Sequence, residues 1–152
     1  MTNSYAAYQK NLVEGADRGT LVLLLYDGLL KFLFEAKKSF EEENYKEGFA
    51  LLTRADRIVK ELIGSLDMEK GGEIAHNLFR LYEFVLWKLL LAEKERKAKH
   101  IEEASHIIYE LRSAWKEAIS KMKEGEKSEK VDRKDKKEKG KVDDAPSISI
   151  IG

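Results

Sequence analysis

The sequence contains no cysteine and a single proline, Pro146. Without cysteine the chain forms no disulfide, no thiolate nucleophile and no cysteine-ligated metal site. Net charge is absent too, because 28 Lys and Arg balance 28 Asp and Glu, so no overall field attracts nucleic acid or an anionic membrane. No segment approaches about 18 uninterrupted apolar residues, and residues 1–12 lack a signal-peptide pattern. We therefore expect a soluble, cytoplasmic protein with no nucleic-acid partner and no membrane insertion.

The residues that are abundant favour long helices. Leu, Ala, Glu and Lys are frequent, and the single proline leaves the helical hydrogen-bond ladder intact over most of the chain. Apolar residues at spacings of three and four predict helices over residues 20–43, 46–66, 73–94 and 101–122. Short connections between helices of this length favour antiparallel neighbours. The fold class predicted is all-α, an antiparallel up-down four-helix bundle.

The pattern also predicts three regions along the chain. Residues 1–16 form a short apolar N-terminal cap segment that packs on the bundle, and residues 17–124 form the bundle itself. Residues 125–152 form a charged, flexible tail, or at most a frayed extension of the fourth helix, because their composition offers little apolar burial. Near the end of this tail Ile148, Ile150 and Ile151 are apolar again. A flexible span on the order of 25 Å lets them fold back onto the bundle, as an alternative to a plain disordered end.

Two of the predicted helices are more apolar than one core requires. An antiparallel bundle needs about three apolar positions in seven, but 11 of the 14 residues in 21–34 and 12 of the 15 in 78–92 are apolar. At 100° per residue the surplus falls outside the core face of each helix. The predicted core faces are Leu21, Leu25, Leu29, Phe32 and Ala36 on the first helix, and Ile74, Leu78, Leu81, Tyr82, Val85 and Leu89 on the third. The predicted outer rows are Leu23, Leu30 and Phe34 on the first helix, and Phe84, Trp87 and Leu91 on the third, flanked by Phe79 and Leu90.

Three explanations of these outer rows stay open at this point. The N-terminal segment or uneven packing covers them within the chain, or they form a symmetric homodimer face. The third explanation is a groove for an apolar partner segment, because contiguous exposed apolar patches usually mark interaction sites.

An enzymatic site is the less favoured interpretation. Glu73 and His76, and likewise Glu103 and His106, have the E-x-x-H spacing that makes half of a di-iron site in helical bundles. The same 100° arithmetic turns all four side chains away from the core, which predicts solvated surface residues. No phosphate-binding, dinucleotide-binding or zinc-protease motif occurs in the sequence. We therefore predict no enzymatic activity, no metal site and no cofactor.

Four short motifs occur in order between residues 5 and 122. They read Tyr5-Ala6-Ala7-Tyr8-Gln9-Lys10-Asn11, Leu24-Leu25-Tyr26-Asp27-Gly28, Asp67-Met68-Glu69-Lys70-Gly71-Gly72-Glu73-Ile74-Ala75 with Asn77-Leu78 and Leu81-Tyr82, and Leu111-Arg112 with Ala114-Trp115-Lys116. In this order and spacing the motifs resemble the flagellar secretion chaperone FliS family.

The resemblance implies a cytoplasmic helical bundle that binds the disordered C-terminal segment of flagellin in an apolar groove. Such a protein prevents premature flagellin polymerisation and delivers flagellin to the flagellar export gate. It also implies that the N-terminal segment covers part of the binding surface and takes part in gate recognition. The candidate partner-binding residues are Tyr5, Tyr8, Gln9, Leu23, Tyr26, Leu30, Phe34, Phe79, Phe84, Trp87, Leu90 and Leu91. The alternative is a helical-bundle homo-oligomer with a structural or regulatory role.

Overall fold

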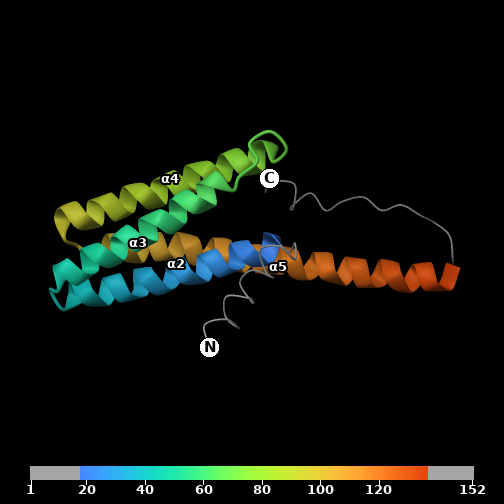
Figure 1. Ribbon diagram of the computed structural model, residues 1–152, viewed down its shortest axis with the longest axis horizontal. Coiled ribbons are helices and arrows are strands. Elements are labelled where there is room, and N and C mark those ends of the chain that lie inside the picture. Colours follow the sequence, from blue (N-terminus) through green and yellow to red (C-terminus); the bar gives the residue numbers. More distant parts are fainter. Residues whose placement is uncertain (1–17, 137–152) are drawn as a thin grey trace, which may run out of the picture.

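The computed structural model describes residues 18–136, so the predicted cap segment 1–16 lies outside the described residues. Within that range the chain forms α2 (Arg18–Glu41), α3 (Tyr45–Gly64), α4 (Gly72–Glu95) and α5 (Ala98–Lys136). Each helix runs antiparallel to the next, and α5 returns to lie beside α2 (Figure 1). The predicted four-helix bundle is confirmed, and the first three helices end within two residues of their predicted limits.

The core is formed by one buried stripe from each helix. Its centre holds a hydrogen bond between the hydroxyls of Tyr26 on α2 and Tyr82 on α4, whose oxygens lie 2.6 Å apart. Burial raises the pKa of both phenols above 10.0, their ordinary value, so both stay protonated at neutral pH. The pair therefore links two diagonally opposite helices through neutral groups.

The buried stripe of α2 differs from the predicted one. Of the predicted set only Leu29 and Ala36 are buried, and the observed stripe is Val22, Tyr26, Leu29, Leu33, Ala36 and Phe40. Leu21, Leu25 and Phe32 are half-buried instead. The reason is that α2 lies between two neighbours: Arg54 of α3 contacts the Phe32 ring on one side, and Arg112 of α5 pairs with Asp27 on the other. The buried stripe of α2 therefore lies on the part of its surface between the contacts with α3 and with α5.

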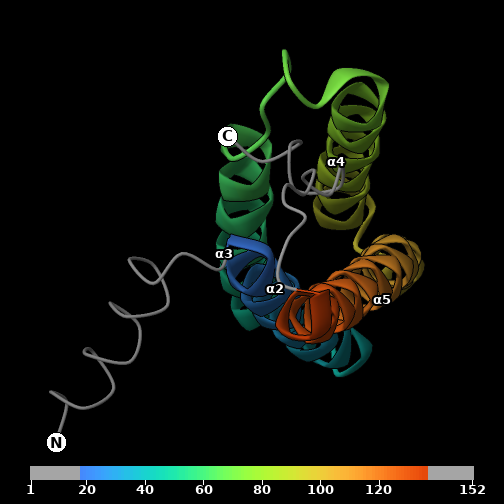
Figure 2. The ribbon, with the colours of Figure 1, turned by 90° about the vertical axis from the view of Figure 1, so that its right-hand side faces the viewer.

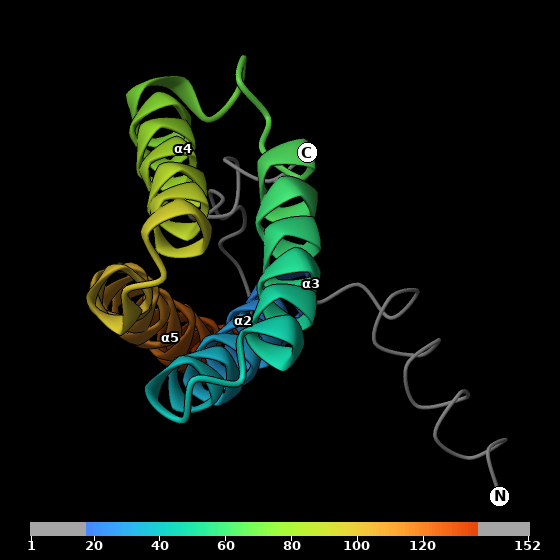
Figure 3. The ribbon, with the colours of Figure 1, turned by 90° about the vertical axis from the view of Figure 1, so that its left-hand side faces the viewer.

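The predicted core face of α4 is wrong at two positions. Tyr82, Val85 and Leu89 are buried as expected, but Ile74 and Leu81 are exposed. In Figure 1 the α3–α4 hairpin inclines away from α2 and α5 toward the loop that joins α3 to α4. Figures 2 and 3, taken along the bundle from opposite ends, show α4 standing apart from α3 above the α2–α5 pair. The N-terminal half of α4 is therefore less enclosed than close antiparallel packing predicts.

The opposite end of α4 is fixed by contacts across the α4–α5 turn. Arg96 takes the left-handed conformation at φ 55°, and its guanidinium lies over the rings of Tyr45 and Phe49 at the start of α3. His100, which is buried, places Nε2 2.8 Å from the carboxylate of Glu95. These contacts hold the last turn of α4 against both neighbours, so α4 is anchored at one end.

The last helix is longer than predicted. α5 continues past the predicted end at residue 122 to Lys136, projecting beyond the rest of the bundle (Figure 1). Of the two alternatives for the start of the charged segment, a continuation of the fourth helix agrees with residues 125–136 as the structure describes them. The segment is rich in Lys and Glu, which have high helix propensity, and Gly125 alone costs only about 1 kcal/mol in a helix. Residues 137–152, including the apolar Ile148, Ile150 and Ile151, lie outside the described residues.

Candidate partner-binding site

A row of large apolar side chains crosses the outer surface of α4. Leu81, Phe84, Trp87 and Leu90 follow each other at intervals of three residues and are 38%, 45%, 52% and 54% exposed. Residues three apart on a helix form a continuous ridge that winds obliquely round its surface. We call these four residues the α4 ridge. At 1.5 Å per residue the ridge is about 14 Å long, or two and a half helical turns.

The α4 ridge runs from one neighbouring helix toward the other. Beside Phe84, the Lys88 ammonium lies 5.3 Å from the ring centroid and 3.3 Å from the Glu103 carboxylate of α5. That contact places the Phe84 end of the ridge on the α5 side. Each step of three residues turns the ridge by about 60°, so Trp87 points outward and Leu90 lies toward the α3 side. Leu81 and Leu90 therefore point about 180° apart, and a partner segment that contacts all four side chains must wrap obliquely round α4.

The outer row predicted on α2 is mostly covered. Leu23 and Leu30 are partly buried and pack against the core, whereas Phe34 is 70% exposed. On α5, Tyr109 is also exposed, at 60%. The surplus apolar content of α2 therefore lies largely inside the seams that this helix makes with its neighbours, and only one of its three predicted outer residues is open to a partner.

Tyr26 is not a surface residue. Its side chain is 1% exposed, so Tyr26 cannot contact a partner directly, and its inclusion among the binding residues is corrected. The motif that suggested Tyr26 has an internal role, because Tyr26 bonds Tyr82 and the next residue, Asp27, pairs with Arg112 of the fourth motif. Sequence motifs of this kind mark contacts between helices as readily as binding surfaces.

The remaining predicted site residues fall into two groups. Phe79 and Leu91 on α4 are half-buried. Tyr5, Tyr8 and Gln9 lie outside the described residues. Two exposed residues were missed as surface residues: Leu81, which belongs to the ridge, and Ile74, about two helical turns before it, at 53% exposure. The i+3 spacing of residues 81, 84, 87 and 90 is the signal that could have identified Leu81.

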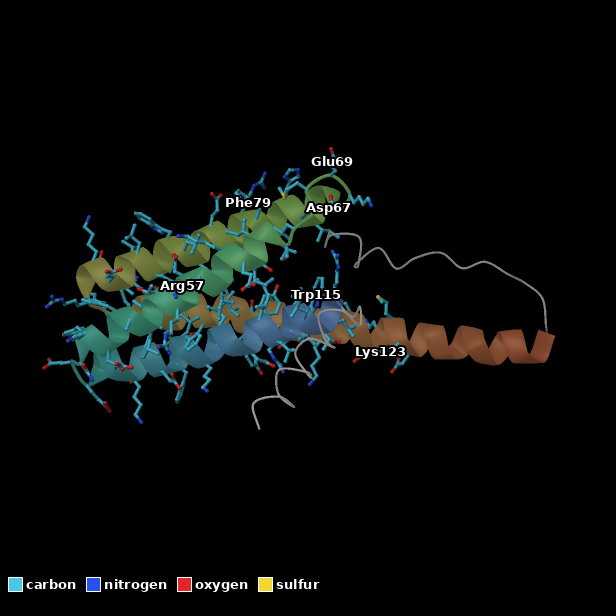
Figure 4. All side chains as sticks on the ribbon, viewed as in Figure 1. Arg57, Asp67, Glu69, Phe79, Trp115 and Lys123 are labelled. Atoms are coloured by element: carbon cyan, nitrogen blue, oxygen red, sulfur yellow. The ribbon has the colours of Figure 1, made fainter. Side chains whose placement is uncertain are left out.

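The fourth motif joins α5 to the start of α2. The indole nitrogen of Trp115 donates a hydrogen bond to the Gly19 carbonyl at 3.0 Å. Figure 4 labels Trp115 where α5 passes the first turn of α2. The third motif shapes the loop between α3 and α4, where the Asp67 carboxylate accepts hydrogen bonds from the amides of Glu69 and Lys70 at 3.1 and 2.9 Å. These residues hold the scaffold that presents the α4 ridge.

The side chains considered for a metal site all face solvent. Glu73, His76, Glu103 and His106 are exposed, as the helical arithmetic predicts. Nowhere in residues 18–136 do three or more His, Asp or Glu side chains gather closely enough to hold a metal ion. None of the helices between Arg18 and Lys136 combines the length and apolarity of a bilayer-spanning segment.

Fold and surface together define the class of protein. Residues 18–136 form a helical bundle that carries an exposed apolar ridge on α4. The family described as Flagellar protein FliS matches residues 1–122. Flagellar secretion chaperone FliS from Campylobacter jejuni is 35% identical over 114 residues, which cover 75% of this chain and 89% of that protein. Its counterpart from Bacillus subtilis is 30% identical over 117 residues, covering 77% and 86%.

The chain therefore belongs to the FliS family of flagellar secretion chaperones. These relatives are named as chaperones, which is a non-enzymatic role. A solved structure, the crystal structure of a flagellar chaperone from bacteria, has the same fold, with a TM-score of 0.66 at 16% identity over 78% of this chain and 98% of that one. The family match ends at residue 122, so the projecting part of α5 lies beyond it.

Proposed function

We propose that this protein binds the C-terminal segment of flagellin along the α4 ridge. The observation that carries the proposal is the row Leu81, Phe84, Trp87 and Leu90, which the bundle leaves between 38% and 54% exposed. A partner segment that is disordered when free must recover its lost conformational entropy by burying apolar surface. Four large side chains in one row supply that surface to a segment that wraps obliquely round α4 with apolar residues at matching spacing.

The proposed chaperone action follows from the binding of the flagellin segment to α4. While the segment lies on α4 it is unavailable for assembly with other flagellin subunits, so the chaperone prevents polymerisation in the cytoplasm without using ATP. Release then accompanies delivery to the flagellar export gate. The candidate residues for gate recognition are Tyr5, Tyr8 and Gln9, which the family resemblance suggests.

The experiment is a calorimetric titration with a synthetic peptide of the flagellin C-terminal segment. Trp87→Asp removes a large apolar side chain from the middle of the ridge and introduces a charge there. We expect the dissociation constant to rise by about tenfold or more, the effect typical of a central interface aromatic. Tyr109→Asp is the matched control, because it makes the same kind of change at an exposed aromatic residue on another helix. Its dissociation constant should stay within about twofold of the unmodified protein.

Two results would count against this assignment. If both substitutions weaken binding equally, or neither does, the peptide does not use the α4 ridge. Light scattering on the same samples tests the homo-oligomer alternative. A chaperone should bind one peptide per chain as a monomer, whereas a dimer that dissociates on Trp87→Asp would assign the ridge to self-association.

Recognition of the gate has a separate test. Tyr8→Ala should leave peptide affinity within about twofold, since Tyr8 is not part of the α4 ridge. The same substitution should lower the amount of flagellin exported by cells, measured in the culture medium. Normal export would remove Tyr8 from the proposed gate-recognition residues.

A further inference from the structure

A second apolar area lies on the N-terminal half of α4 and the loop before it. Ile74 is 53% exposed, and Met68, in the loop before α4, is 37% exposed. Leu81, the first residue of the α4 ridge, lies about two turns after Ile74 on the same face of α4 and continues this area. We call Met68, Ile74 and Leu81 the α4 entry patch. It occurs where the helices diverge, because α4 inclines away from α5 toward the α3–α4 loop (Figure 1).

The part of the chain that follows α5 contains a complementary segment. After Lys136 come eight residues, six of them charged, with Gly140 and Val142, and then the uncharged sequence Ala145-Pro146-Ser147-Ile148-Ser149-Ile150-Ile151. Three isoleucines within four positions give this segment an apolar character that nothing else after Met122 has. We propose that Ile148, Ile150 and Ile151 occupy the α4 entry patch of the same chain. The proposal goes beyond the proposed function, and it holds or fails whether or not flagellin binds the α4 ridge.

The length of the tether selects this patch. Lys88 of α4 lies beside Glu103 of α5, and the two helices are antiparallel, so Ile74 is level with about residue 117 of α5. From there to Lys136 the helix rises about 28 Å. The twelve residues from 137 to 148 span at most about 40 Å when extended, which is sufficient to bring Ile148 back to Ile74. Leu90 is level with about residue 101, more than 50 Å from the helix end, and is beyond reach.

The extended α5 therefore changes what the tail can contact. A flexible tail from residue 125 could return to any part of the bundle, whereas a helix that continues to Lys136 carries the start of the tail away from the α4–α5 turn. Tethering also raises the effective concentration of the isoleucines near the patch into the millimolar range, so a weak apolar contact is populated. The patch shares Leu81 with the α4 ridge, so the tail and a ridge-bound partner would compete at that end of the ridge.

The absence of cysteine allows a direct test by disulfide cross-linking in the full-length chain. One variant carries Asn77→Cys, an exposed position one turn from Ile74 on the same side of α4, together with Ser149→Cys in the tail. The matched control carries Lys94→Cys, an exposed position at the far end of α4, with the same Ser149→Cys. We expect intramolecular cross-linking of the Asn77 pair to be at least about tenfold faster than that of the Lys94 pair, because only the first position is within reach.

A third variant separates apolar docking from mere proximity. Ile148→Ser, Ile150→Ser and Ile151→Ser, added to the Asn77 pair, should slow cross-linking severalfold while the tether length stays the same. Equal rates for the Asn77 and Lys94 pairs would overturn the proposal, and so would an unchanged rate in the triple serine variant. A cross-linked dimer as the main product would overturn it as well, because the tail would then occupy a second copy. Circular dichroism of each variant establishes that the bundle is folded in all the proteins whose cross-linking rates are compared.

Discussion

The two most apolar helices, α2 and α4, have similar composition but opposite surroundings. α2 lies between α3 and α5, so Leu23, Leu25, Leu30 and Phe32 are partly covered by its neighbours, and Phe34 and Leu24 stay largely open. α4 is anchored at its C-terminal end and inclines away from the bundle at its N-terminal end. Its surplus residues form an exposed ridge instead. Apolar surplus therefore stays exposed only on a helix that its neighbours leave uncovered.

The largest expected effect separates the two helices by stability. Leu30→Asp on α2 should lower the free energy of unfolding by about 2–4 kcal/mol, because it puts a charge against the core. Trp87→Asp on α4 should change it by less than about 1 kcal/mol, since the side chain is half exposed. Urea unfolding followed by circular dichroism measures both. Equal losses would mean that α2 and α4 are covered to the same extent.

A smaller effect concerns the contact that joins α2 to α4. Tyr82→Phe leaves the buried hydroxyl of Tyr26 without its partner and should destabilise the protein by about 1–3 kcal/mol. Replacing both tyrosines by phenylalanine removes the unsatisfied group and should recover most of that loss. The same urea experiment completes the double-mutant cycle. The cycle also needs the single variant Tyr26→Phe. If the double variant loses as much free energy of unfolding as the two single variants together, the hydroxyls act independently.

The smallest effect concerns the anchored end of α4. The hydrogen bond from His100 holds the pKa of the Glu95 carboxyl below its ordinary value of 4.5, and the positive charges of Lys97 and Lys99 act in the same direction. A lowered pKa means that the ionised carboxylate stabilises the fold above about pH 4.5, and that this contribution disappears as pH falls through the folded-state value. Glu95→Gln should therefore flatten the loss of stability from about pH 5 to about pH 3. Identical acid-unfolding curves would exclude a stabilising Glu95–His100 contact.

Helix positions could be predicted from the sequence because they depend on local periodicity and turn residues. The limits of α2, α3 and α4 follow from that pattern to within two residues. Which face of a helix is buried depends also on how the helix is tilted against its neighbours, and the periodicity of the sequence carries no information about tilt. Ile74 and Leu81 have the spacing of core residues, but the inclination of α4 exposes them. The sequence predicts the end of the last helix too early, because its charged residues after 122 offer little apolar burial, whereas α5 continues to Lys136.

The motifs were informative about the family and less so about the site. Tyr26, Asp27, Arg112 and Trp115 belong to the recognised motifs, and the structure places all four in contacts between helices. In the α4 ridge, Phe84, Trp87 and Leu90 lie outside the motifs, and only Leu81 lies within one. A binding surface for a variable partner needs apolar character at a given spacing more than it needs particular residues.

The central claim is that flagellin's C-terminal segment lies on the α4 ridge. Hydrogen exchange of the full chain, with and without a saturating amount of the C-terminal flagellin peptide, tests it most directly. We predict slower exchange along α4 from residue 81 to residue 90, with smaller changes in the middle of α2. Protection confined to α2 and α5, with α4 exchanging as in the free protein, would contradict the assignment of the ridge as the binding site.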